Sequence, residues 1–136
     1  MALSTSLTSK AYMVEKTVNL GTASGTVVGP AVAAGTLVLA SGVEVITAAE
    51  DITTFTVAVS DATTTFMAAT SIDAAAAGTM VFGTQVLGIS ADADTIDAVT
   101  VISGTTAGVT ARVWAIVVDV NEATRDAAEV ARDQNA

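Results

Sequence analysis

Short runs in which apolar residues alternate with threonine or other small residues, set apart by glycines and polar clusters, restrict this chain to β structure. The clearest run is Thr53–Ser60, whose phenylalanine and two valines would point to one side of a strand, with threonine and alanine on the other. Residues Tyr12–Leu20 alternate in the same way, interrupted by Lys16. Threonine accounts for about one residue in six, and β-branched side chains pack well on a pleated strand.

The strand patterns recur at short, fairly even spacing. A two-residue hairpin turn at Ser41-Gly42 is predicted between two of them. The alanines of Phe66–Ala77 favour helix, and the strands on both sides favour a short helical turn within a loop. We expect eight or nine strands from the following segments: Tyr12–Leu20, Thr26–Val28, Thr36–Ala40, Val43–Thr47, Thr53–Ser60, Thr79–Phe82, Gln85–Ile89, Ile96–Ile102 and Val109–Val120.

No alternation of strand and helix patterns is present, so a parallel sheet is not expected. The predicted fold is all-β: an antiparallel β-sandwich, with a jelly roll of about eight strands favoured by the strand count, followed by a short C-terminal helix. The length of 136 residues suggests one domain. We divide it into an extended arm or disordered tail over 1–11, the sandwich over 12–120, and a helix or tail over 121–136. Asn121 suits the N-cap of that helix and Glu122 its first turn.

The chain contains neither histidine nor cysteine. It therefore lacks the usual general acid and base, the best nucleophile, and the leading ligands for zinc, copper and iron. We expect a protein that is not an enzyme and has no cofactor, and a disulfide scaffold is excluded. Hydrophobic residues make up 51% of the chain but aromatic residues only 4%. An alanine and valine core buries little area per residue, so oligomerisation is the expected supplement.

Charge and hydropathy narrow the class of partner. Fourteen acidic and five basic residues give a net charge of −9, and such a field repels nucleic acid. The longest purely apolar run, Val113–Val118, is far shorter than the roughly 20 residues that cross a bilayer. The first ten residues have neither the basic start nor the apolar stretch of a secretory signal. We therefore expect no nucleic-acid partner, no membrane partner and no Sec-type export.

The predicted final strand, Val109–Val120, is apolar on both faces. Its odd-numbered positions from 109 to 117 carry valine and alanine, and its even-numbered positions include Arg112, Trp114, Ile116 and Val118. A strand of a sandwich normally has one wet face. In one interpretation the C-terminal helix or a loop covers the second face. In the other, that face is a subunit interface anchored by Trp114 and Arg112, residue types enriched at interfaces.

Two acidic clusters are candidate sites. Asp92, Asp94 and Asp97 have a spacing that could chelate calcium, but the EF-hand glycine and glutamate are absent, and a solvated acidic turn is favoured. Glu50 and Asp51 could in principle serve acid–base chemistry, but a solvated loop is the favoured interpretation. No metal site and no catalytic residue is therefore assigned.

Three segments carry a resemblance to a known class of proteins: AAGTLVLASG over 33–42, TTFTVAVSDATTTFMAATSID over 53–73, and DTIDAVTVISGTTAGVTARVWAIVVDV over 94–120. In their alanine, glycine, threonine and valine content the chain resembles small virion structural proteins of tailed bacteriophages, particularly head decoration (cement) proteins. The resemblance implies a jelly-roll or sandwich homotrimer on the exterior of the virion, bridging subunits of the major capsid protein.

The leading hypothesis is therefore a non-enzymatic capsid decoration protein. Because extended segments can add to an exposed sheet edge, the arm is the candidate for docking on the capsid, with Leu3, Leu7, Lys10 and Tyr12 as contact residues. The alternatives are a phage head-fibre or tail receptor-binding module that recognises glycans, or a bacterial surface-layer module. Glycan binding would favour exposed aromatic residues, of which this chain has few.

Overall fold

The computed structural model describes residues 10–48, 52–61, 63–73, 75–90, 93–104 and 108–119. These residues form strands and turns and contain no helix, which confirms the all-β prediction. The predicted C-terminal helix lies outside the described residues, as do Leu3 and Leu7 of the arm. The strands are β1 (Tyr12–Asn19), β2 (Gly25–Val27), β3 (Ala31–Val32), β4 (Thr36–Val45), β5 (Ile52–Ser60), β6 (Thr65–Ser71), β7 (Met80–Val81), β8 (Gly88–Ile89), β9 (Asp94–Thr95), β10 (Asp97–Gly104) and β11 (Thr110–Asp119).

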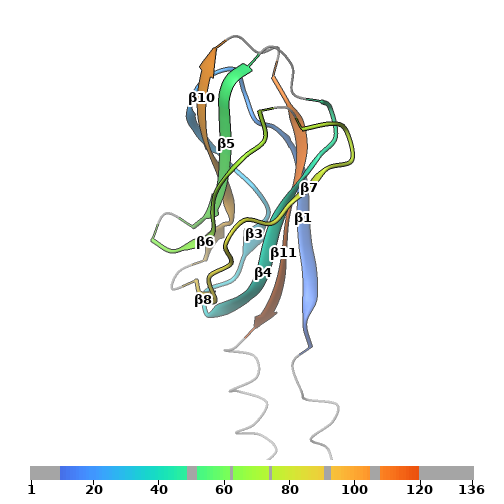
Figure 1. Ribbon diagram of the computed structural model, residues 1–136. Coiled ribbons are helices and arrows are strands. Elements are labelled where there is room, and N and C mark those ends of the chain that lie inside the picture. The colour runs from blue at the N-terminus through green and yellow to red at the C-terminus, as the bar shows by residue number, and fades with distance from the viewer. Residues whose placement is uncertain are drawn as a thin grey trace, which may run out of the picture.

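The strands form two antiparallel sheets and a short ribbon. Sheet A has the order β1-β11-β4-β7, with β8 also paired to β4, and sheet B has the order β2-β10-β5-β6. The ribbon joins β3 and β9. Figure 1 shows β5, β6 and β10 in one layer and β1, β4 and β11 in the other. The predicted antiparallel β-sandwich architecture is thus present as two facing layers, described by eleven strand segments rather than about eight.

The core lies between the sheets and follows from the alternation along each strand. Phe55, Val57 and Val59 of β5 are fully buried, as the sequence pattern predicted. They face a valine-rich surface from sheet A, because inward positions recur every second residue along β11 and along β4 on either side of its bulge at Leu39. The buried residues of sheet A include Val38, Val43, Val45, Ala111, Val113, Ala115 and Val117. Each fully buried valine or phenylalanine contributes about 1.5–3 kcal/mol, so many small contributions stabilise the sandwich.

Two local predictions were wrong. The predicted hairpin at Ser41-Gly42 is absent, since β4 runs without a break through both residues and pairs with β11 along its length. Phe66–Ala77 does not begin with a helical turn, because its first residues belong to β6, which pairs with β5. Phe66 and Met67 are both fully buried. Burial of these large side chains between the sheets outweighs the weak helical preference of the alanines that follow.

The start of β1 and the end of β11 lie at the same end of the sandwich. The two strands are antiparallel neighbours, and Tyr12 pairs with Val117. Figure 1 shows both of these strand ends at the bottom of the view. No helix in the described ranges is long and apolar enough to cross a membrane.

Candidate interaction surface

The even-numbered residues of β11 lie on the outer face of sheet A. Arg112 pairs with Glu44, Trp114 with Gly42, and Ile116 with Ala40, whereas the odd-numbered neighbours point into the core. Trp114 is nevertheless only 8% exposed. The alternation predicted from sequence is therefore correct, and the outer face carries a largely buried tryptophan. Val118 lies on the same strand beyond the register shift at Ile116/Val117 and is half-buried.

Gly42 makes room for the tryptophan. A Cβ atom at position 42 would lie 2.6 Å from Cζ2 of Trp114 and 2.8 Å from the carbonyl oxygen of Val81, closer than real Cβ atoms approach their neighbours. The indole therefore lies across the backbone of β4 at the one residue type without a side chain. A glycine within a strand often marks such a close approach, and here it explains why Ser41-Gly42 is not a turn.

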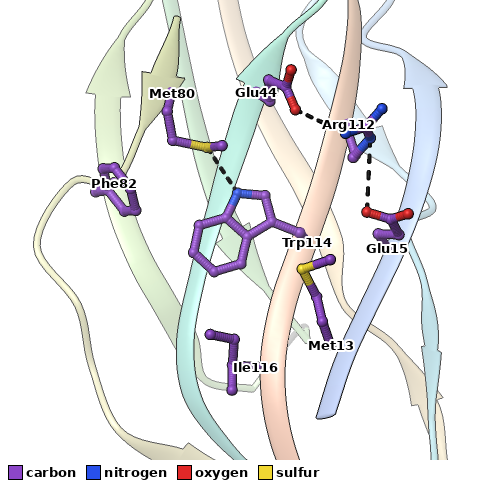
Figure 2. A pocket seen from close by; sticks show the side chains of 8 residues that line it. All are labelled: Met13, Glu15, Glu44, Met80, Phe82, Arg112, Trp114 and Ile116. Atoms are coloured by element: carbon purple, nitrogen blue, oxygen red, sulfur yellow. Dashed lines mark hydrogen bonds and ion pairs between the residues drawn. The ribbon is translucent and has the colours of Figure 1, made fainter.

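The segment that contains β7 covers the tryptophan from the other side. The ring centroids of Phe82 and Trp114 are 5.8 Å apart, with an edge-to-face angle of 76°. The indole Nε1–H donates to Sδ of Met80 at 3.0 Å, and a thioether is a weak acceptor. Figure 2 shows Met80 and Phe82 beside the indole, with Ile116 and Met13 along its other side. The segment around β7 thus supplies part of the cover over this face.

These side chains form a groove of about 300 Å³ that we call the Trp114 groove. Met13 is 55% exposed, Phe82 53% and Met80 40%. Flexible methionines adapt to irregular partners, and contiguous exposed apolar side chains mark interaction sites. The lining residues are Met13, Glu15, Glu44, Met80, Phe82, Arg112, Trp114 and Ile116.

One end of the Trp114 groove is charged. Nη1 of Arg112 lies 3.0 Å from a carboxylate oxygen of Glu44, and its Nε lies 3.8 Å from one of Glu15. All three side chains are partly exposed, so each ion pair contributes little to stability. The cluster carries a net charge of −1. The groove is therefore an apolar surface with a small acidic excess at its border.

The candidate site residues from the sequence divide into two groups. Arg112, Trp114 and Ile116 come together in the Trp114 groove, and Val118 lies further along the same strand. The described members of the arm, Lys10 and Tyr12, are exposed, and Tyr12 begins β1. Tyr12 directly precedes Met13, which lines the groove, but neither Lys10 nor Tyr12 is among the lining residues.

Sequence reasoning did not assign Met80, Phe82 or Gly42 to this site. Met80 and Phe82 were placed in a separate predicted strand, and Gly42 in a predicted turn. A glycine inside an otherwise regular strand pattern opposite the only tryptophan was the available signal. Using this signal requires knowing that Gly42 of β4 pairs with Trp114 of β11, and the sequence does not reveal that pairing.

The acidic clusters gain no support as sites. Asp94 is exposed, and Asp97 is half-buried and accepts a hydrogen bond from the Gly29 N–H at 3.2 Å. Asp92, Glu50 and Asp51 lie outside the described residues. In the part of the chain that the structure describes, no three side chains of metal-ligating type come together.

Two other carboxylates have structural partners. Asp61 is buried and accepts hydrogen bonds from the backbone N–H groups of Thr63 at 3.1 Å and Thr64 at 2.7 Å, which fixes the turn between β5 and β6. Asp73 accepts a hydrogen bond from the Phe55 N–H. Both carboxylates thus satisfy backbone donors near the ends of sheet B.

The fold and the surface define a class of protein: a two-sheet β-sandwich that carries an apolar groove on the outer face of one sheet. Of three comparisons with known proteins, two found no match: no family model matches the chain, and no curated protein matches it. The third, with solved structures, agrees with the fold. A chain of the cyanophage Pam1 capsid asymmetric unit is similar in structure, with a TM-score of 0.60 and 16% sequence identity, over 82% of this chain and 86% of that chain.

Proposed function

We propose that this protein is a structural protein of a bacteriophage virion, specifically a non-enzymatic decoration protein on the exterior of the capsid. The observation that supports this most strongly is the likeness to a chain of the cyanophage Pam1 capsid asymmetric unit, which extends over most of both chains. The composition of the chain is in keeping with such a role, because it lacks the residues that most enzymes use and is rich in strand formers.

We further infer that the sandwich is a jelly roll. The support is the strand order. When β7 and β8 are counted as one interrupted strand, each sheet has four strands: β1, β11, β4 and β7/β8 in sheet A, and β2, β10, β5 and β6 in sheet B. The chain passes repeatedly between the two sheets, and two sheets of four strands are what eight-stranded jelly rolls contain.

The Trp114 groove is the proposed subunit interface of a homotrimer. Aromatic residues, methionine and arginine are the types enriched at interface cores, and this groove contains all three, with Trp114 as the central anchor. The core provides a reason for association. Its largest fully buried side chains are two phenylalanines, followed by leucine, methionine and isoleucine, and most of the rest are valines. A domain of this kind gains stability when its exposed apolar face is also covered.

A trimer would bind the major capsid protein through three copies of a weak contact. Linking three contacts raises the overall affinity by a factor of about 10²–10⁴ when the trimer geometry matches the shell. Each bound trimer then ties neighbouring capsid subunits together. The net charge of −9 suits a soluble protein on an exposed virion surface.

Co-sedimentation with capsids that lack the protein tests the proposal. We expect the wild-type protein to bind such capsids and to raise the temperature at which they release DNA. Phe82→Asp should lower the apparent affinity by at least tenfold, because a charge in the Trp114 groove disrupts the trimer and with it the trivalent contact. Val101→Asp is the matched control, since Val101 is similarly exposed, at 55%, but lies in sheet B. Absence of binding by the wild-type protein would contradict the proposal.

A further inference from the structure

The four edges of the two sheets are unequal. In sheet B, β2 has three residues, and β6 pairs with β5 through two register shifts. In sheet A, β7 and β8 have two residues each. The fourth edge is β1, whose eight residues pair with β11 in one uninterrupted register. Natural sheets blunt their edges with short strands and bulges, so three edges here are blunted and β1 is long and regular.

The free side of β1 is available for pairing. In an antiparallel strand about half of the backbone N–H and C=O groups point away from the one neighbour, and among the described residues β1 pairs with β11 alone. Lys16 is the one residue of β1 that opposes pairing with another strand. It pairs with Val113, so its charged side chain lies on the inner face of this edge strand. The edge is thus a template for one further strand.

A second groove runs beside this edge. Its volume is about 500 Å³, and its walls come from β1 and from the chain that crosses between the sheets. Every second side chain of an added strand would point toward this space. The lining residues are Val14, Glu15, Lys16, Val28, Gly29, Pro30, Ala31 and Thr95. Because Val28 is exposed and Pro30 cannot donate a hydrogen bond, part of this wall suits an apolar side chain.

We propose that residues 2–9 of a second copy of this chain occupy the β1 edge as an added antiparallel strand. The sequence ALSTSLTS contains no glycine, no proline and no charge, so nothing in it opposes an extended conformation. Eight residues extend for about 26 Å, which matches the eight residues of β1. The proposal goes beyond capsid decoration, and it assigns the arm to another copy of the protein instead of to the capsid protein.

The register follows from the two leucines. Leu3 and Leu7 lie on one face of an extended strand, since they are four residues apart. Pairing Leu7 with Val14 places Leu3 opposite Val18, and both valines are on the inner face of sheet A. Apolar residues then face apolar residues, which stabilises cross-strand pairs. The same register places the serines at positions 4 and 6 on the outer side.

The arm of the same chain is poorly suited to this position. Folding back in the same register would make Lys10 and Ala11 the two central residues of a hairpin turn. Tight two-residue turns need positive φ angles and therefore glycine, asparagine or aspartate. Lys10 and Ala11 are exposed and belong to no turn. A second copy avoids the turn, and each copy then supplies one arm and receives one.

Disulfide trapping tests this proposal in the absence of capsids, because the chain has no native cysteine. Leu7→Cys and Val14→Cys are made as separate full-length proteins, mixed and oxidised. Residues that face each other in an antiparallel pair have Cα atoms about 4.5–5.5 Å apart, within the range that a disulfide bridges. We expect a linked pair of chains on a non-reducing gel. Leu7→Cys mixed with Val101→Cys is the control, and it should give at least tenfold less of the linked pair.

The outcomes separate the possible partners of the arm. Cross-linking of Leu7→Cys to Val14→Cys, but not to Val101→Cys, supports pairing of the arm with β1 of a second copy. No cross-linking, or equal cross-linking with Val101→Cys, overturns it. In the double variant Leu7→Cys/Val14→Cys, a disulfide within one chain would show a hairpin and also overturn it. Failure of capsid decoration would not change these results, because no capsid is present in the experiment.

Discussion

The two sheets present chemically different outer faces. The outer face of sheet A carries the Trp114 groove, with Met13, Phe82 and Ile116 exposed around the indole. The outer face of sheet B carries threonine, alanine and serine from β5 and Val99, Val101 and Ser103 from β10, and in the described part of its strands Val101 is the one exposed large hydrophobic residue. The inner faces, in contrast, are both formed mainly by buried apolar residues.

This difference separates what folding requires from what the proposed association requires. A sandwich needs one apolar face per sheet, and an antiparallel sheet leaves its other face free to be polar. Sheet B follows this arrangement. Sheet A departs from it, and the departure is concentrated around one tryptophan that lies over one glycine. The outer face of sheet A is therefore the surface whose composition folding alone does not explain.

The largest expected effect comes from filling the space under Trp114. Gly42→Ala should destabilise the protein by about 2–3 kcal/mol, because its Cβ would overlap the indole and the Val81 carbonyl. Gly25→Ala in sheet B is the control and should change stability by less than about 0.5 kcal/mol, since no atom lies within 4 Å of that Cβ position. Urea unfolding measures both. Equal effects would mean that the Trp114 groove is not tightly packed.

The second prediction concerns association. Met13→Asp should weaken trimer formation at least tenfold, about 1.4 kcal/mol, because a carboxylate in an apolar interface loses its hydration. Val101→Asp, with the same 55% exposure on sheet B, should leave association unchanged. Native mass spectrometry over a range of concentrations gives both values. Loss of association in both variants would remove the distinction between the two faces.

A smaller effect is expected at the charged end of the groove. Arg112→Met keeps most of the apolar stem but leaves Glu15 and Glu44 without their shared cation. We expect the free energy of unfolding, measured with urea, to fall by about 0.5 kcal/mol at low salt. The loss should shrink in 1 M NaCl, because salt screens the remaining repulsion between the carboxylates. A loss that is independent of salt would indicate that packing, not charge, is responsible.

The smallest effect is expected on sheet B. Thr56→Val replaces a half-buried threonine on its outer face with a side chain of the same shape. Stability should change by less than about 0.5 kcal/mol in the same urea assay. A loss above 1 kcal/mol would show that the hydroxyl face of sheet B has a structural role that sheet A lacks.

Alternation along the sequence was sufficient to predict individual strands and their inner faces. The burial of Phe55, Val57 and Val59 in β5 could be predicted because period-two patterning is a local property. In β11 the same pattern separated the two faces, but it did not show which of two apolar faces is the inner one. The same rule distinguishes the two faces of β1, of which the face with Val14 and Val18 is the more buried. Strand boundaries agree to within a few residues in these three cases.

Predictions that depended on one local signal were less successful. Ser41-Gly42 was interpreted as a turn, but Gly42 serves a contact with a residue 72 positions away, Trp114. Phe66–Ala77 was assigned by its alanines, while Phe66 and Met67 decide the structure through burial. Most of the candidate site was likewise out of reach, because residues such as Met80 and Phe82 join Trp114 only through pairing between distant strands.

The position of the two strand ends has a mechanical consequence. Tyr12 of β1 and Val117 of β11 face each other at one end of the sandwich. A force applied between the beginning of β1 and the end of β11 would separate these neighbours one hydrogen-bonded pair at a time, because the bonds run perpendicular to the strands. Such unzipping loads each bond in turn. A pull directed along β4 instead would shear its ladder with β11, so that many bonds resist together and the fold withstands a larger force.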